Sequence, residues 1–463
     1  MWRRNFLITL VIFIGLCLGT VAINILIDPY DVWTDERRLG FNLCAYRDED
    51  LERLTKPIRV NQFKPETIFI GNSKTDFGLD PDYVDSKIYN LSLRNGQPHE
   101  ILKFIEHAYL NGTRRIFLAV DFEMFADSRE IMPGFDLDQL ESTQMTRKNL
   151  FLTTLSFDAL RDSIITFRKN SDELPNFRTI KLNGEYDDNF LQIIFDSEHE
   201  FLATTRQLIV EAYKLENSDT MLKKFRDFEQ ILEFCCENQI QLVIFIPPVH
   251  STHMEGYSFH RDMYEAWLKK LVETSDIPII DFVSINPVTT DEKFFWNSSH
   301  MKNSVGNMIL DQLIFQKPSE LTFETLSTEN VETHLKNLWT DVENSRDDRL
   351  KYLGRFSSEI PAQIENPIES DLFKIEWITL EKNILSVRGK IELPRDEISH
   401  AYIMVENFYS QLINLDSKTD SSYNFFTESI LPAEIGDRRA KIIVVTKSSG
   451  VLMSKFFNVE AKN

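Results

Sequence analysis

An uncharged apolar segment near the N-terminus constrains most strongly how this chain can fold. The residues from Phe6 to Ile27 carry no charged side chain, and a helix of that length spans the roughly 30 Å hydrocarbon core of a bilayer. Arg3 and Arg4 precede the segment and Asp28 follows it, so the positive-inside rule predicts a cytoplasmic N-terminus. Residues 1–27 are therefore predicted to form a short cytoplasmic stub and a transmembrane anchor.

A cleaved signal peptide is the alternative for this segment. Thr20-Val21-Ala22 would supply a cleavage site, but the apolar run continues to Ile27 and is long for a signal peptide. We favour the uncleaved anchor. It predicts a single-pass protein of the inner (cytoplasmic) membrane, with the bulk of the chain periplasmic.

The overall charge and the cysteines limit the classes of partner and cofactor. The 463 residues carry a formal net charge of −21, whereas nucleic acids and anionic lipids bind basic surfaces. We therefore expect neither nucleic acid nor anionic lipid as a main partner, although local basic patches remain compatible with this charge. The four cysteines show no CxxC spacing and are too few for a disulfide framework. The sequence thus predicts neither a metal site nor a cofactor.

An alternation of short apolar runs with helical patterns begins near Glu66, after a stretch at 28–64 that is predicted to be an irregular membrane-proximal stalk. Helical spacing of apolar residues occurs at Glu100–Leu110 and Leu222–Asn238. The alternation predicts an α/β domain over residues 65–316, with a parallel sheet covered on both faces. Its strands are predicted at Thr67–Ile70, Lys87–Leu91, Ile116–Asp121, Leu242–Ile246 and Ile277–Phe282.

Three further segments complete the predicted organisation. Residues 128–215 are too long for a loop and carry helical patterns at Phe151–Phe167 and Phe201–Tyr213, so we expect an inserted cap over the sheet edge. Residues 317–365 are predicted to be a helical linker, with its charged helix at 328–353. Residues 366–463 alternate as β-strands do and predict a β-sandwich-like accessory domain, with strands at Lys374–Thr379, Ile384–Ile391, Tyr402–Glu406, Tyr423–Ile430 and Ala440–Thr446.

Ser73 follows the first predicted strand in the sequence Gly71-Asn72-Ser73. A Gly-x-Ser after a strand places the hydroxyl at a helix N-terminus, where backbone N–H groups can stabilise an oxyanion. A serine that only caps the next helix is the structural alternative. A histidine downstream decides between them, because a serine needs a base before it acts as a nucleophile.

His300 is the candidate base, in Asn297-Ser298-Ser299-His300 ahead of an amphipathic helix over Val305–Phe315. A side chain three residues before the histidine can reach the imidazole and hold its tautomer. Asn297 can accept that N–H bond but supplies no charge for an imidazolium. Asn297 also begins a glycosylation sequon, and a glycan there would block the site.

These motifs together resemble the SGNH/GDSL superfamily of esterases and acyltransferases, above all its membrane-anchored, envelope-facing bacterial branch, which includes alginate O-acetyltransferase-like proteins. Gly71-Asn72-Ser73 is similar to the family's first block, Gly-Asp-Ser, and Asn297 to His300 lies where the family has Asp-x-x-His. The stretch from Tyr89 to Gly96 is similar to the second block, which implies oxyanion or substrate contacts for Asn95 and Gly96. The resemblance implies a three-layer α/β/α domain of SGNH type.

Two departures from the family pattern exchange an acid and an amide. Ala119-Val120-Asp121 lies where the third block, Gly-x-Asn-Asp, is expected, with Asp121 in place of an oxyanion-donating asparagine. An ionised aspartate cannot donate a hydrogen bond. Asn297 in turn replaces the acid of the triad. Either Asp121 lies near the Ser73–His300 pair and rearranges its charge, or Asp121 merely caps the following helix and the enzyme is weak or degenerate.

His250 is a further candidate at the same sheet edge, after the strand that ends in Ile246. We consider a substrate contact by His250, a plain loop histidine, and a metal pair with His253; no carboxylate pattern supports the metal pair.

The resemblance implies an esterase or O-acyltransferase that acts on acyl, chiefly acetyl, esters of a cell-envelope glycan through a Ser–His acyl-enzyme. Ser73, His300 and Asn297 are the predicted catalytic residues, and Gly96, Asn95, Asp121 and His250 the oxyanion or substrate residues. The expected partners are an envelope polysaccharide or another acyl-ester substrate and the membrane, reached through Phe6–Ile27. A catalytically degenerate envelope scaffold or glycan-binding module is the alternative, and membership of an envelope protein complex remains open.

Overall fold

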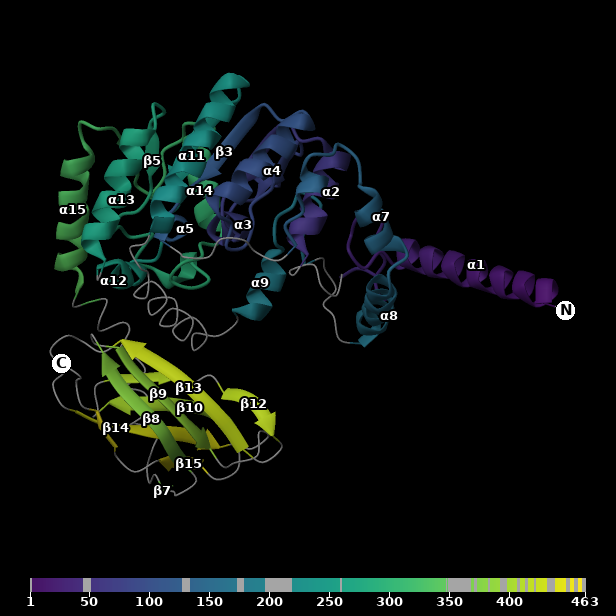
Figure 1. Ribbon diagram of the computed structural model, residues 1–463. Helices are drawn as coiled ribbons and strands as arrows, with labels where there is room; N and C mark the ends of the chain where they lie inside the picture. Colours follow the sequence, from purple (N-terminus) through teal and green to yellow (C-terminus); the bar gives the residue numbers. More distant parts are fainter. Residues whose placement is uncertain are drawn as a thin grey trace.

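A long N-terminal helix projects from a mixed α/β body (Figure 1). The structure is a computed structural model, and it describes residues 2–44, 51–126, 134–172, 179–195, 219–258, 260–346, 348, and the strands between Ile368 and Val459. Helix α1 spans Trp2–Ile27, and among the described residues it is the one helix long and apolar enough to cross a membrane. The coarse prediction of an N-terminal apolar helix is therefore confirmed.

The body is built on a six-stranded sheet with the order β2-β1-β3-β4-β5-β6. Neighbouring strands from β2 to β5 pair in parallel, and only β6 runs antiparallel, beside β5. Each of the five predicted strands is present, whereas β6 was not predicted. The strands are β1 (Thr67–Ile70), β2 (Ile88–Asn90), β3 (Arg115–Ala119), β4 (Gln241–Ile246), β5 (Ile279–Asp281) and β6 (Glu324–Leu326).

Helices cover both faces of this sheet, as the alternation predicts. Because successive strand side chains point to opposite faces, Ile68 and Ile70 join one buried cluster while Phe69 joins the other. The first cluster packs under α4 (Pro98–Leu110), α11 (Asp219–Glu237), α13 (Arg261–Thr274) and α15 (Val331–Asn344), and the second under α14 (Asn303–Leu313). Short helices follow the strands: α3 (Ser73–Gly78), η2 (Pro81–Tyr83), α5 (Phe122–Ala126), α12 (His253–Ser258) and η3 (Glu292–Phe294).

The stretch at 28–64, predicted to be irregular, contains a regular helix, α2 (Glu52–Phe63). This helix packs against α4, and two of its cations form buried ion pairs: Arg53 with Glu100 at 2.7 Å and Lys56 with Asp76 at 2.7 Å. The helix was not predicted because Pro57 lies within it and because its polar sequence shows no clear apolar periodicity. Residues 51–63 thus belong to the folded body.

The insertion predicted at 128–215 forms several short helices in its described part: α6 (Leu137–Leu140), α7 (Arg147–Thr154), α8 (Phe157–Asp172) and α9 (Asp188–Ile194). The single helical pattern expected at Phe151–Phe167 is interrupted, because Ser156 lies between α7 and α8 and its Oγ accepts the N–H of Ala159 at 3.0 Å. The predicted helix at Phe201–Tyr213 lies outside the described residues.

The segment predicted as a linker helix contributes to the α/β core through α15, whose buried side chains face α13. Within the described part of the chain after α15, ten strands form two largely antiparallel sheets, ordered β11-β10-β14-β15-β7, with β16 also on β14, and β12-β13-β9-β8. The predicted packing as a sandwich stays a prediction. The strands are β7 (Ile368–Glu369), β8 (Phe373–Glu381), β9 (Ile384–Ile391), β10 (Ile398–Val405), β11 (Tyr409–Leu412), β12 (Leu415–Thr419), β13 (Ser422–Ile430), β14 (Arg438–Thr446), β15 (Gly450–Met453) and β16 (Phe457–Val459).

Candidate functional site

Ser73 lies where β1 ends and α3 begins, at the sheet edge where the parallel strands terminate. Asn72 caps α3, with its side-chain oxygen accepting the N–H of Lys74 at 3.1 Å. A Cβ added to Gly71 would come within 2.8 Å of the Ala119 methyl group, so only glycine lets β1 end this close to β3. Ser73 is half-buried, whereas Asn72 and Lys74 are buried.

His300 contacts Ser73 and Asn297 through its two ring nitrogens. Its Nε2 lies 2.8 Å from the Ser73 Oγ, and its Nδ1 lies 2.9 Å from the Asn297 Oδ1. The same Asn297 oxygen accepts the backbone N–H groups of Ser299 and His300. Because this oxygen only accepts, Nδ1 must carry the ring proton. Nε2 then has a lone pair for the Ser73 hydroxyl proton, as a general base requires.

The surroundings keep His300 neutral. Desolvation lowers the pKa of His300 to about 3, and the Lys74 ammonium acts in the same direction, against the opposing charge of Glu123. A neutral imidazole has a free lone pair for the serine proton, but a pKa this low also makes the ring a weak base at neutral pH.

The loop that carries His300 is held at both ends. Phe295 and Met301 form an antiparallel bridge, and the Trp296 N–H donates to the His300 carbonyl at 2.8 Å. Behind the loop, α14 packs closely on α3, because a Cβ on Gly306 would lie only 1.6 Å from the Gly78 carbonyl oxygen. This contact fixes the distance between the helix after His300 and the helix that begins at Ser73.

Lys74, directly after the serine, is a buried cation held by two carboxylates. Its Nζ lies 3.0 Å from Asp121 Oδ2, 2.9 Å from Glu123 Oε2 and 3.3 Å from the Tyr257 hydroxyl. Burial alone would lower the pKa of Lys74, but the two carboxylates raise it above its usual range. Asp121 also accepts the Asn72 amide and, at 2.9 Å, the Met124 N–H.

Asp121 thus has both of the roles weighed for it from the sequence: it caps the following helix, and it lies near the Ser73–His300 pair through Asn72 and Lys74. Its contacts explain why a carboxylate is present after β3, since a buried Lys74 needs an anionic partner.

A second chain of contacts runs from Glu123 to the loop of His300. Glu123 Oε1 lies 2.7 Å from Nε2 of the fully buried His253, whose Nδ1 lies 3.0 Å from the Ser298 Oγ. Burial by itself would raise the pKa of Glu123, but Lys74 and His253 hold it below its usual range. Glu123, His253 and Ser298 therefore tie the end of β3 to the residue beside Asn297.

The sequence reading missed Lys74, Glu123 and His253 as members of this site. His253 was weighed only as half of a metal pair with His250, and no group of three potential metal ligands occurs among the described residues. The signal that could have found Lys74 is a cation shortly after the end of a buried strand, which must meet an acid when buried.

The glycine predicted for the oxyanion hole lies beside the serine loop. A Cβ on Gly96 would approach the Gly71 carbonyl oxygen to 2.9 Å, and the Gly96 N–H donates to the Leu93 carbonyl at 2.9 Å. Its oxyanion role stays a prediction, because that donor already has a partner. Asn95 is exposed and has a left-handed backbone, with φ of 53°.

His250 is buried inside the loop cluster, 1% exposed, and does not reach the open side of the site. The ring Nδ1 of His250 lies 2.8 Å from the Thr252 hydroxyl, and the backbone N–H of His250 donates to the Ser298 carbonyl at 2.9 Å. Burial lowers the pKa of His250 to about 4. These contacts make it a support for the His300 loop rather than a group at the rim.

Aromatic side chains from the insertion line the site beside His300. The Phe77 ring lies 4.9 Å from the His300 ring and 4.9 Å from the Tyr186 ring, and Phe195 stacks on Trp296 at 6.0 Å. Phe77, Tyr186, Leu191 and Trp296 form one buried cluster. The part of the insertion around α9 thus packs over the loop that carries His300, as a cap would.

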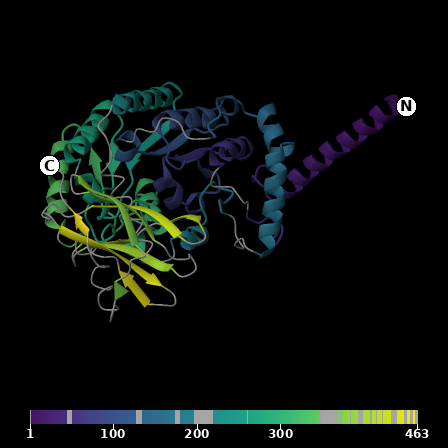
Figure 2. The ribbon, with the colours of Figure 1, turned by 60° about the horizontal axis from the view of Figure 1, so that its bottom comes forward.

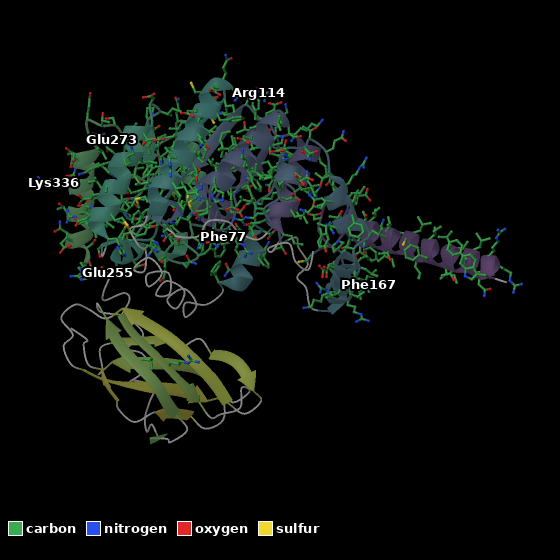
Figure 3. All side chains as sticks on the ribbon, viewed as in Figure 1. Phe77, Arg114, Phe167, Glu255, Glu273 and Lys336 are labelled. Carbon is green, nitrogen blue, oxygen red and sulfur yellow. The ribbon has the colours of Figure 1, made fainter. Side chains whose placement is uncertain are left out.

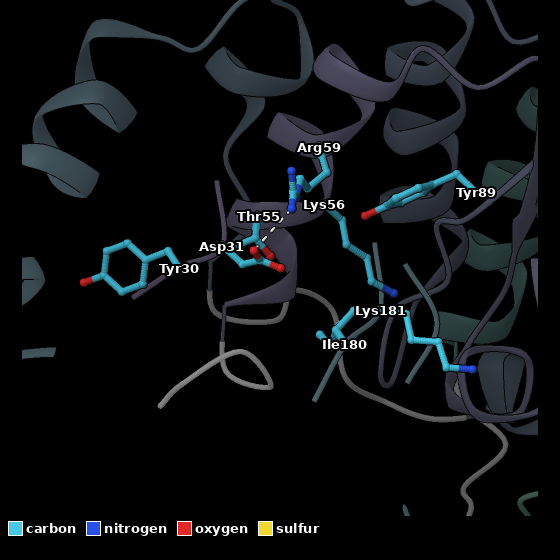
Figure 4. A pocket seen from close by; sticks show the side chains of 8 residues that line it. All are labelled: Tyr30, Asp31, Thr55, Lys56, Arg59, Tyr89, Ile180 and Lys181. Atoms are coloured by element: carbon cyan, nitrogen blue, oxygen red, sulfur yellow. Dashed lines mark hydrogen bonds and ion pairs between the residues drawn. The ribbon is translucent and has the colours of Figure 1, made fainter. Parts of the chain in front are cut away.

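A separate polar pocket lies between the segment after α1, helix α2 and residues 180–181 (Figure 4). Three cations line it, and each has an anionic partner: Lys56 pairs with Asp76, Arg59 with Asp31 at 3.2 Å, and Lys181 with Glu185 at 3.0 Å. The lining residues are Tyr30, Asp31, Thr55, Lys56, Arg59, Tyr89, Ile180 and Lys181.

Comparison with known protein families and with curated proteins identifies no relative: no family model matches the chain, and no curated protein matches it significantly. The arrangement of Ser73, His300 and Asn297 therefore carries the functional argument by its own geometry.

Proposed function

We propose that this protein is a serine esterase or O-acyltransferase that works through a Ser73–His300 acyl-enzyme. One observation carries the proposal: the Ser73 Oγ and the His300 Nε2 lie 2.8 Å apart while Asn297 holds the ring in the base-competent tautomer. Such an arrangement suits acyl transfer because the serine can lose its proton as it attacks. The resemblance to SGNH enzymes, including an SGNH-type three-layer fold, belongs to the same proposal.

The reaction would proceed in two balanced steps. Ser73 Oγ attacks the acyl carbonyl while His300 takes its proton, and His300 returns that proton to the departing alcohol as the ester bond breaks. Water or a second alcohol then attacks the acyl-enzyme, with His300 again accepting and returning a proton. The Ser73 N–H, at the first position of α3, has no partner within its helix and is the donor we assign to the oxyanion.

The substrate class follows from location and from the resemblance. An anchored chain whose body lies outside the cytoplasmic membrane meets the glycans of the cell envelope, and acetyl is the acyl group that the resemblance implies. The aromatic cluster of Phe77, Tyr186 and Trp296 is buried beside His300, so it supports the loop of the base and does not offer a face to a sugar ring. Location and the resemblance lead us to propose acyl esters of an envelope glycan as substrates.

One observation favours the non-catalytic alternative, an envelope scaffold or glycan-binding module. Asn297 carries no charge, and the low pKa of His300 shows that its surroundings disfavour the imidazolium that forms during attack. A site that has kept its geometry but lost its acid would look the same.

The test is hydrolysis of p-nitrophenyl acetate by the full chain in detergent, with Ser73→Ala, His300→Ala and the control Ser304→Ala. Ser304 is exposed on α14 and makes no part of the site. We expect the first two variants to lose at least about 100-fold in kcat/KM and the control to keep its rate.

A serine-directed fluorophosphonate separates the two functions when the ester assay gives only background. Covalent labelling at Ser73 in the wild type, lost in Ser73→Ala, supports the acyl-enzyme even for a strict transferase. Background rates combined with absent labelling would overturn the proposal in favour of the scaffold.

A further inference from the structure

Helices α7 and α8 in the insertion have their polarity reversed relative to ordinary helices of a globular protein. Apart from Ala159, their buried side chains are polar: Asn149, Thr153 and Thr154 on α7, and Asp162, Ser163, Thr166 and Asn170 on α8. A helix on a protein surface normally buries its apolar stripe and exposes its polar side chains. Something other than water is therefore expected on the outer face of this pair.

The outer face of the pair is apolar. Phe157, Ile164 and Phe167 recur at helical spacing on the exposed side of α8, with Phe157 80% exposed. On α7 the exposed residues Leu150, Phe151 and Leu152 lie between the buried polar ones. Exposed charged side chains accompany both groups: the basic Arg147, Lys148, Arg161 and Arg168, and the acidic Asp158. Lys148 pairs with Asp136 at 3.0 Å and Arg161 with Asp162 at 3.1 Å, so each keeps an acidic neighbour. Apolar and basic side chains together are the composition of helices that lie in a membrane interface.

The buried polar side of the pair forms hydrogen bonds with the C-terminal end of α1. The Asn24 side chain, fully buried, donates to the Thr154 carbonyl at 2.8 Å and accepts from the Ser163 hydroxyl at 2.8 Å. Just beyond α1, the Tyr30 hydroxyl contacts Asp162 at 3.1 Å. These contacts fix α7 and α8 at the level where the apolar helix enters the body.

The contacts through Asn24 and Tyr30 place α8 beside the end of α1. Helix α8 crosses α1 near its base, on the side of the body from which α1 projects (Figures 1 and 2). Phe167, labelled in Figure 3, extends from α8 beside that base. The exposed apolar surface of α1 reaches as far as Leu26, which is 62% exposed, and α1 contacts both α7 and α8, so neighbouring helices expose apolar side chains near the base of α1.

We propose that α7 and α8 form a second membrane-contacting element, lying in the interface of the leaflet from which the body emerges. Their apolar side chains would insert at the level of the upper acyl chains, and their basic side chains would meet lipid phosphates. The proposal rests on α1 as the membrane-spanning helix and is independent of the acyl-transfer chemistry.

The test measures the fluorescence of a polarity-sensitive label at single positions of the full chain, reconstituted into lipid nanodiscs. Cysteines are placed by Phe157→Cys or Ile164→Cys on α8, and by Glu273→Cys on α13 as the control, in a background with Cys17→Ala and Cys236→Ser. The remaining cysteines, Cys44 and Cys235, are buried. Each variant is labelled with the fluorophore NBD and titrated with lipids that carry a nitroxide near the top of the acyl chain.

We expect NBD at both α8 positions to emit at shorter wavelength than the control and to lose at least about two-fold in intensity with the nitroxide lipid. The Glu273→Cys label should show neither change. Quenching at the α8 positions no stronger than at the control would overturn the proposal.

A second copy of the chain is the competing occupant of this apolar face. Disulfide formation between Phe157→Cys chains in one disc, without quenching by the nitroxide lipid, would assign the face to a dimer and overturn the membrane contact. Because hydrolytic activity is not the readout, failure of this test is distinct from failure of the proposed function.

Discussion

The partner of the His300 Nδ1–H group is uncharged: the Asn297 side-chain oxygen accepts its hydrogen bond. Asn297 supplies the correct tautomer, because its oxygen accepts, but not the negative charge that stabilises an imidazolium. The carboxylates after β3, Asp121 and Glu123, are bound to Lys74 instead. At the scale of the residue, His300 has the geometry that a general base needs, but no carboxylate stabilises its protonated form.

Substituting Asn297→Asp should therefore strengthen the base. An aspartate oxygen can accept the same three N–H groups, and its charge a few ångströms from the ring should raise the pKa of His300 from about 3. The wild type should show kcat/KM for p-nitrophenyl acetate independent of pH above about 5, since the ring is neutral throughout. Asn297→Asp should increase kcat about 10- to 100-fold and move the acid limb upward into the measurable range.

The pH profile of both proteins between pH 4 and 8 checks this prediction, with Asn297→Ala as the variant that loses the acceptor. If the acid limb of the pH profile is unchanged in Asn297→Asp, the aspartate charge does not raise the pKa of His300.

Ser73 and His300 could be predicted from the sequence because each follows a recognisable strand or precedes a recognisable helix. Lys74, Glu123 and His253 could not, because their roles depend on which strand ends are neighbours. Asp121 and Glu123 follow β3 and His253 follows β4. Only the sheet order β1-β3-β4 brings the ends of these strands together near Lys74, which follows β1.

At the scale of the element, the site depends on the contact between α3 and α14. Gly306 and Gly78 allow the two helices to touch, and the helices position His300 and Ser73 respectively. A methyl group on Gly306 has no room beside the Gly78 carbonyl oxygen, so the helices must separate.

Gly306→Ala should destabilise the protein by about 1–3 kcal/mol through overpacking. It should also lower kcat at least about 10-fold, since a shift of an ångström between base and nucleophile is costly. Thermal unfolding and esterase kinetics measure the two effects, with Ser304→Ala as the control on the same helix. Full activity in Gly306→Ala would contradict a fixed α3–α14 distance.

The regular elements of the α/β domain were predictable, because their apolar periodicity is strong. Helix α2 was not, because Pro57 interrupts its pattern and its buried side chains include Arg53 and Lys56, whose partners lie far along the chain. Strand β6 was missed because Glu324–Leu326 is short and has only Leu326 buried. The break between α7 and α8 was missed because their apolar residues, counted along the chain, look like one stripe.

At the scale of the whole molecule, the insertion divides into two parts with different tasks. The part around α9 packs its aromatic side chains over the loop of His300. The part made of α7 and α8 holds the end of α1 through Asn24. A cap over the rim was the single role predicted for the insertion, because the reversed polarity of α8 becomes visible only when its buried face is known.

Asn24→Leu should loosen α1 from α7 and α8. The change removes two buried hydrogen bonds and leaves the Ser163 hydroxyl and the Thr154 carbonyl without this partner, at a cost of about 1–3 kcal/mol. Hydrogen exchange in lipid nanodiscs should then show faster exchange in α8, with α13 unchanged. Val21→Leu, within the same helix, is the matched control, and equal exchange in both variants would argue against this contact.

If α1 spans the bilayer and α8 lies in its interface, as proposed, the crossing of the two helices has a consequence for how the protein would search for substrate. A body tethered by one helix can tilt freely, but a body tethered by a helix and a flat second contact can only slide in the plane and spin about the membrane normal. Ser73 would then travel at a constant height above the lipid headgroups. The protein would meet esters at that height by diffusing in the membrane plane. Esters farther from the membrane would reach Ser73 only if their own chain were flexible enough to approach the surface.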